Sequence, residues 1–80
     1  MKVNIIGFGI AREIFGSSCI SLELDESATV QTLSEAIQKN YPKLAGPGSF
    51  AVAVNNEYAL SGLSIQSSDE IAIIPPVSGG

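Results

Sequence analysis

One apolar stripe in the middle of the chain limits the folds that its 80 residues can adopt. Apolar side chains recur three and four positions apart between Val30 and Tyr41, which is the spacing of one face of an amphipathic helix. Ser27 or Thr29 can cap the start of this helix, and Pro42 ends it, because proline disfavours helical geometry at the preceding residue. A single stripe must be buried against another apolar surface, so we expect the flanking segments to form a sheet.

The flanking segments have the alternating pattern of β-strands, in which every second side chain lies on the same face. The predicted strands are residues 2–8, 20–25, 50–54, 57–60 and 70–74. A short helix is expected at Ile10–Phe15, a tight turn at Asn55 and Asn56, and a loop over residues 43–49. Leu63 and Ile65 are expected to pack under the sheet from a turn-rich segment.

This order of elements predicts an α+β fold, the β-grasp or ubiquitin-like roll, with a mixed sheet of about five strands, one main helix and one short helix. We expect the first hairpin and the last strand to lie centrally, with the main helix across the concave face. A chain of this length supports one core, so we predict a single domain over residues 1–76 and a flexible reactive tail over residues 77–80.

The composition excludes several classes of function. The chain has no histidine and a single cysteine, Cys19, which argues against histidine acid–base catalysis, cysteine or serine triads and zinc sites. Four basic residues against eight acidic ones give a net charge of −4, which argues against a nucleic-acid partner. No apolar run approaches the roughly 20 residues of a membrane helix, and no secretory signal is apparent, so we expect a cytoplasmic protein that binds no metal and is not an enzyme by itself.

The end of the sequence is the strongest candidate for chemistry. Six residues follow the last predicted strand: Pro75, Pro76, Val77, Ser78, Gly79 and Gly80. Fully extended they reach roughly 20 Å, and the two glycines fit a channel too narrow for other residues. A terminal carboxylate is ionised at neutral pH and must be activated before it reacts, for example as an acyl-adenylate. Because Gly7 and Gly9 do not form a complete phosphate-binding loop, we expect another protein to carry out that activation.

Five segments of the chain, together covering most of its length, carry a resemblance to a known family. They are Phe8 with Ala11-Arg12-Glu13 and Gly16, the helix over residues 29–42, Val52-Ala53-Val54-Asn55, Asp69-Glu70-Ile71-Ala72, and Pro75-Pro76-Val77-Ser78-Gly79-Gly80. In these segments the chain resembles the sulfur-carrier family of the molybdopterin synthase small subunit, a group that also holds the thiamine-pathway sulfur carrier. The thiamine carrier usually lacks the double proline, which favours the molybdopterin branch.

The resemblance implies a mechanism and a set of partners. An ATP-using, E1-like enzyme adenylates the Gly80 carboxylate, with Gly79 beside it, and sulfur transfer converts it to a covalent thiocarboxylate; no cofactor is bound. The loaded tail delivers sulfur to a pterin precursor in the large synthase subunit, in a heterotetramer. The family's apolar partner-binding patch corresponds to Phe8, Tyr58 and Ile74, and the segment 75–78 also binds partners.

Alternation places Phe8 and Ile74 on the face opposite Val3 and Ile5, whereas the face of Tyr58 is not fixed by the sequence. A small protein also exposes apolar residues that have no function, and such residues would show the same alternation. Three other functions remain open: a sulfur carrier for thiamine or another cofactor, a ubiquitin-like modifier joined to target lysines through Gly80, and an interaction module with an inert tail.

Overall fold

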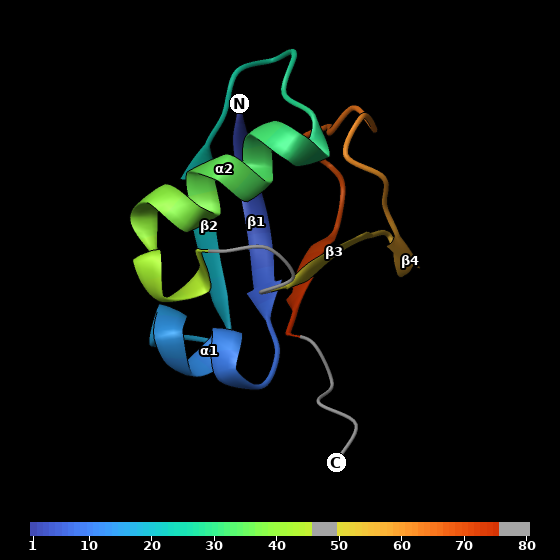
Figure 1. Cartoon of the computed structure of the whole chain (residues 1–80). Coiled ribbons are helices and arrows are strands. Elements are labelled where there is room, and N and C mark those ends of the chain that lie inside the picture. Colours follow the sequence, from blue (N-terminus) through green and yellow to red (C-terminus); the bar gives the residue numbers. More distant parts are fainter. Residues whose placement is uncertain (46–49, 76–80) are drawn as a thin grey trace.

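The computed structural model describes residues 1–45 and 50–75, and its elements follow the predicted order (Figure 1). The strands are β1 (Lys2–Gly7), β2 (Cys19–Glu23), β3 (Ala51–Val54), β4 (Glu57–Tyr58) and β5 (Ile71–Ile74), and the helices are α1 (Ile10–Phe15), α2 (Val30–Asn40) and the 3₁₀ turn η1 (Pro42–Leu44). The predicted tail, residues 77–80, lies outside the described residues. No helix among the described residues is long and apolar enough to cross a membrane.

Within these residues, the five strands form one mixed sheet in the order β2-β1-β5-β3-β4. β1 and β5 pair in parallel, and the other three neighbouring pairs are antiparallel. The predicted β-grasp is confirmed. The prediction that the whole first hairpin lies centrally is wrong for β2, because the second neighbour of β1 is β5 and β2 is left at the edge of the sheet.

The backbone N–H groups at the start of helix α2 all donate hydrogen bonds. Its first three N–H groups, those of Val30, Gln31 and Thr32, donate to the carbonyl oxygens of Leu63 and Ser61 and to Oγ1 of Thr29, at 2.9, 2.9 and 3.4 Å. Thr29, and not Ser27, is therefore the N-cap. Because backbone carbonyls of the segment between β4 and β5 supply two of these acceptors, that segment is held against the start of α2.

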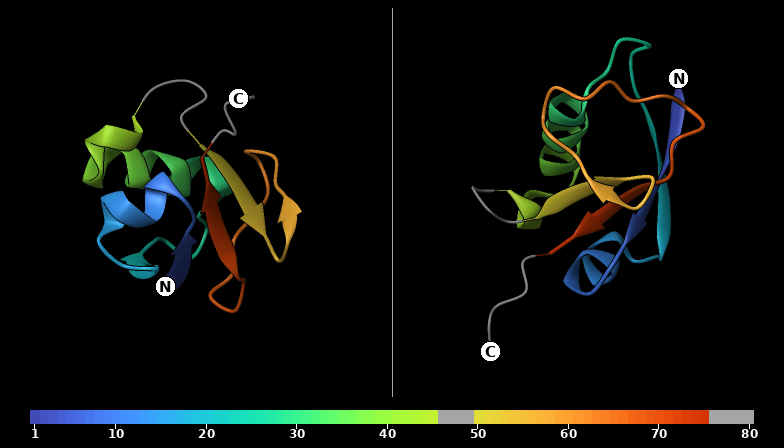
Figure 2. Two further views of the ribbon diagram at one scale, coloured as in Figure 1. Left: turned by 90° about the horizontal axis from the view of Figure 1, so that it is seen from below. Right: turned by 90° about the vertical axis from the view of Figure 1, so that its right-hand side faces the viewer.

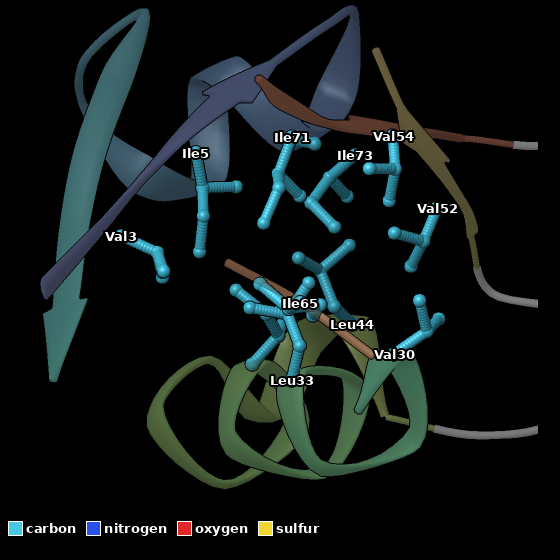
Figure 3. Close-up of a cluster of buried hydrophobic side chains, with 12 residues drawn as sticks. Val3, Ile5, Val30, Leu33, Leu44, Val52, Val54, Ile65, Ile71 and Ile73 are labelled. Carbon is cyan, nitrogen blue, oxygen red and sulfur yellow. The ribbon is translucent and has the colours of Figure 1, made fainter. Parts of the chain in front are cut away.

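The core lies between α2 and one face of the sheet. Figure 3 shows Val3 and Ile5 of β1 and Ile71 and Ile73 of β5 projecting toward Leu33 of α2. These side chains are completely buried, as the alternation in the strands and the stripe on the helix predict.

Two loop predictions are wrong. Residues 43 and 44, predicted as loop, belong to η1, and Leu44 is 2% exposed within the core. Leu63, predicted to pack under the sheet, is 45% exposed, whereas Ile65 is buried as expected. A loop has no periodicity from which burial can be read, so in both segments the contacts with α2 and the sheet decide which side chain turns inward.

The predicted tight turn between β3 and β4 is confirmed. Asn55 and Asn56 have φ of 53° and 71°, the positive values that a type I′ hairpin turn requires at both central positions. The Asn55 side chain also accepts a hydrogen bond from the Glu70 N–H at 3.0 Å and donates one to Oδ1 of Asp69 at 3.1 Å. These bonds tie the turn to the chain that enters β5, and so they position β4 at the edge of the sheet.

Candidate functional site

The face of the sheet away from α2 is the candidate site. Figure 2 shows α2 on one side of the sheet, and no helix among the described residues covers the other side, here called the outer face. The outer side chains are the ones that alternate with the core residues, for example Ile6 between Ile5 and Gly7. A surface that is left uncovered in this way is available to a partner.

Pairing between strands places one row of side chains across four strands of the outer face. Ile6 lies opposite Ala72, Ala72 opposite Ala53, and Ala53 opposite Tyr58. The two central residues are alanines and the two outer ones are large, so the row dips in the middle. The result is a hollow of about 390 Å³, whose lining residues are Ile6, Phe8, Ala53, Asn56, Tyr58, Glu70, Ala72 and Ile74.

One end of the hollow is apolar and lies where the chain leaves the sheet. The Phe8 N–H donates to the carbonyl of Ile73 at 3.2 Å, which continues the β1–β5 pairing past the end of β1 and sets Phe8 next to Ile74. The Phe8 side chain is 50% exposed, although an aromatic ring of this size is usually buried in the core of a small protein. Pro75 follows directly and is half-buried near Gly9.

The other end of the hollow is polar. Asn56, from the β3–β4 turn, and Glu70, just before β5, supply its polar groups, and both side chains are exposed. The Tyr58 side chain forms one flank and is 74% exposed. The hollow therefore runs from Phe8 and Ile74, beside the exit of the chain, to a single carboxylate at the far end.

The structure brings together the three patch residues predicted from the sequence. Phe8, Tyr58 and Ile74 all line the hollow, and the pairing of Tyr58 with Ala53 settles its face, which the sequence left open. Of the predicted tail residues, Pro75 is described, whereas Pro76, Val77, Ser78, Gly79 and Gly80 lie outside the described residues. Sequence reasoning missed the alanine floor and Glu70; alternation alone could have placed the alanines on the outer face, but not opposite each other.

No cluster of nucleophilic or metal-ligating side chains in the described part of the chain competes with this site. Cys19 is a free, exposed thiol on the edge strand β2, with the hydroxyl of Ser17 bonded to its backbone. Among residues 1–45 and 50–75, no three histidine, cysteine, aspartate or glutamate side chains are placed to hold a metal ion. Two further hollows lie beside α1 and along residues 57–63, but of these three only the hollow of the outer face is lined by β5, from which the chain leaves the sheet.

Comparison with known proteins identifies the family of this chain. Residues 5–80 match the ThiS family. The chain belongs to the ThiS family. It is 40% identical to the molybdopterin synthase sulfur carrier subunit of Dictyostelium discoideum, covering 99% of this chain and 96% of that protein. It is 33% identical to the subunit of the same name from Arabidopsis thaliana, covering 100% and 84%.

A solved structure confirms the fold of this ThiS-family chain. SAMP1 from Haloferax volcanii superposes with a TM-score of 0.82 over 100% of both chains, at 28% sequence identity. The β-grasp predicted from the order of elements is therefore shared with SAMP1. The resemblance to the sulfur-carrier family, recognised in five sequence segments, is confirmed as well.

Proposed function

We propose that this ThiS-family protein is the sulfur carrier of a molybdopterin synthase, and that the Gly80 carboxylate is the group that carries the sulfur. The observation that carries the proposal is the match, over nearly the full length of both chains, to curated sulfur carrier subunits of that synthase. The family match supports it further, because it covers residues 5–80 and so includes Gly79 and Gly80.

The proposed loading takes two steps. An E1-like partner joins the Gly80 carboxylate to the α-phosphate of ATP, which releases pyrophosphate and leaves an acyl-adenylate. Hydrosulfide supplied by a sulfur donor then attacks the carbonyl carbon; the C–S bond forms as the C–O bond to AMP breaks, AMP departs with that oxygen, and the proton of the hydrosulfide is lost to solvent. The product is a thiocarboxylate, and ATP belongs to the partner, so this chain binds no cofactor of its own.

The body of the protein has a different part in the proposed cycle. It presents the tail and binds, in turn, the activating enzyme and the large synthase subunit, with which it would form a heterotetramer. The outer face suits this role because its apolar end lies beside Pro75, so a partner that covers Phe8 and Ile74 also receives the continuing chain. In that complex the thiocarboxylate passes its sulfur to a pterin precursor, and this chain acts as a donor subunit, not as a catalyst.

A ubiquitin-like modifier is the second candidate. The protein of Haloferax volcanii that shares the fold at 28% identity is named small archaeal modifier protein 1. Such a modifier would use the same activated carboxylate, but a lysine amine would attack it, and an isopeptide bond would form. A sulfur carrier for thiamine or another cofactor is the third alternative, since it shares the same loading chemistry.

Intact-mass measurement separates a sulfur carrier, for molybdopterin or for another cofactor, from a ubiquitin-like modifier. Incubation with the activating enzyme, ATP and a sulfur donor should increase the mass by about 16 Da, the difference between oxygen and sulfur. Conjugates of higher mass would instead identify a modifier, and an unchanged mass would reject both. A chain extended by one residue after Gly80 is the matched control, because its former carboxyl is held in an amide.

Deleting Gly80 should abolish sulfur loading while the thermal unfolding temperature stays unchanged, because the core residues of the described part of the chain lie within residues 3–73. Circular dichroism and mass spectrometry on the same sample test both parts. Sulfur loading of the shortened chain would contradict the assignment of Gly80.

A further inference from the structure

We propose that the hollow on the outer face is a socket for one apolar side chain of the large synthase subunit, and that Glu70 pairs with a lysine or arginine of that subunit. The identity of the partner rests on the proposed function. The two contacts would fix both the position and the direction of the subunit on the sheet.

The shape of the hollow suits a single inserted side chain. Ala53 and Ala72 are paired neighbours on β3 and β5, and together they form its floor. Ile6 and Phe8 rise on the β1 side, and Tyr58 rises on the β4 side. An apolar side chain placed between them would contact apolar atoms below and on two sides, which is the setting in which buried anchors of interfaces are found.

The charge of the hollow indicates what accompanies that side chain. Glu70 is the one acidic residue in the lining, and no lysine or arginine lines it. Within the part of the chain that the structure describes, its carboxylate has neither an ion pair nor a hydrogen bond. A partner that covers the hollow would remove water from around this carboxylate, so a cation must meet it to avoid a desolvation cost.

The same charge argues against a second copy of this chain as the occupant. A symmetric dimer through this face would bring together two identical surfaces, each with Glu70 as its charged lining residue. Neither hollow would supply the cation that Glu70 needs, because no lysine or arginine lines it. A partner with a basic residue is complementary to the hollow and also to the net charge of −4 of the whole chain.

The position of Glu70 would determine the orientation of the partner on the outer face. It lies at the end of β5 where the chain enters the sheet, whereas Phe8, Ile74 and Pro75 lie where the chain leaves it. An apolar anchor alone would allow the partner to rotate over the hollow. A charge pair at the far end would hold the partner in the one orientation that receives residues 76–80.

The test measures binding of the full chain to the purified large subunit from the same organism by titration calorimetry. Ala72→Val fills the socket with a residue that favours strands, and Ser21→Val places the same side chain on the outer side of the edge strand β2 as its control. Glu70→Lys reverses the charge, and Glu35→Lys makes the same change on an exposed position of α2, which covers the other face of the sheet.

Ala72→Val and Glu70→Lys should each weaken binding by at least about tenfold, and the two controls should stay within about twofold. Glu70→Gln should weaken binding less and reduce its dependence on salt concentration, because it removes the charge and keeps the shape. The circular dichroism spectra of all variants should match that of the wild type.

Three results would refute the proposed binding socket. The first is wild-type affinity in both Ala72→Val and Glu70→Lys, and the second is a wild-type chain that does not bind the large subunit. The third is a wild-type dimer, seen by sedimentation analysis, that Ala72→Val dissociates. The gain of about 16 Da is measured on the wild type without the large subunit. If the mass increases and the wild type binds the large subunit, but both variants keep wild-type affinity, the socket fails and the proposed function stands. If the mass does not increase, or the wild type does not bind the large subunit, the proposed function fails.

Discussion

Leu44 and Leu63 provide a direct test of the structure, because the sequence alone ranks them in the opposite order. Leu44 lies in the turn η1 and is 2% exposed, whereas Leu63 is 45% exposed in the segment between β4 and β5. Truncating a fully buried leucine to alanine costs about 2–5 kcal/mol, which combines the lost burial with the cavity left behind. For the half-exposed Leu63 the loss should be about 1 kcal/mol or less. The backbone carbonyl of Leu63 accepts a hydrogen bond from the Val30 N–H, and truncation of the side chain leaves this bond in place.

The consequence for the whole domain is large. A domain of 80 residues has a free energy of unfolding of about 4–12 kcal/mol, so Leu44→Ala removes a substantial part of it. At about 4–8 °C per kcal/mol, we expect the unfolding temperature to fall by at least about 8 °C for Leu44→Ala, and by a few degrees for Leu63→Ala. Urea unfolding and thermal unfolding, both followed by far-ultraviolet circular dichroism, measure the free energy of unfolding and the unfolding temperature of each variant. An equal or larger loss in Leu63→Ala would refute the placement of η1 in the core.

Two further variants test the packing of α1 and the outer face. Gly7→Ala should cost about 1–3 kcal/mol, because the new Cβ would lie 2.7 Å from Cδ2 of Phe15, while Gly62→Ala, with nothing within 4 Å, should leave the melting temperature unchanged or slightly raised. Equal melting temperatures would contradict this contact. Phe8→Asp should weaken binding to the large subunit by more than about tenfold with little change in stability. The control Ile10→Asp alters an equally exposed residue outside the hollow and should leave binding unchanged. Unchanged binding in Phe8→Asp would remove this residue from the patch.

Much of the fold could be predicted because it depends on local periodicity. The period of two in β1 separates Val3 and Ile5 from Ile6, and the stripe of α2 selects Leu33 and Ile37 for the core. These assignments need no knowledge of the partner element, since any apolar surface would bury the same side chains. They were enough to predict the order of elements and the β-grasp.

The candidate site was only partly predictable because it depends on pairing between distant segments. Phe8 and Ile74 could be placed on one face by alternation, but Tyr58 belongs to a two-residue strand that has no alternation to read. Its face follows from the turn at Asn55 and Asn56, which determines that it pairs with Ala53. Register between strands cannot be read from either strand alone.

By itself, the sequence determined which side chains of each helix and strand are apolar on one side, and therefore that one helix must cover one face of a small sheet. Only the tertiary structure decided that β2 lies at the edge, that Leu44 and not Leu63 enters the core, and that two alanines meet to form a hollow with Glu70 at its end. The physical reason is the range of the interactions: periodic burial follows from backbone geometry over a few residues, whereas edges, loop burial and hollows are set by contacts between residues far apart in the chain.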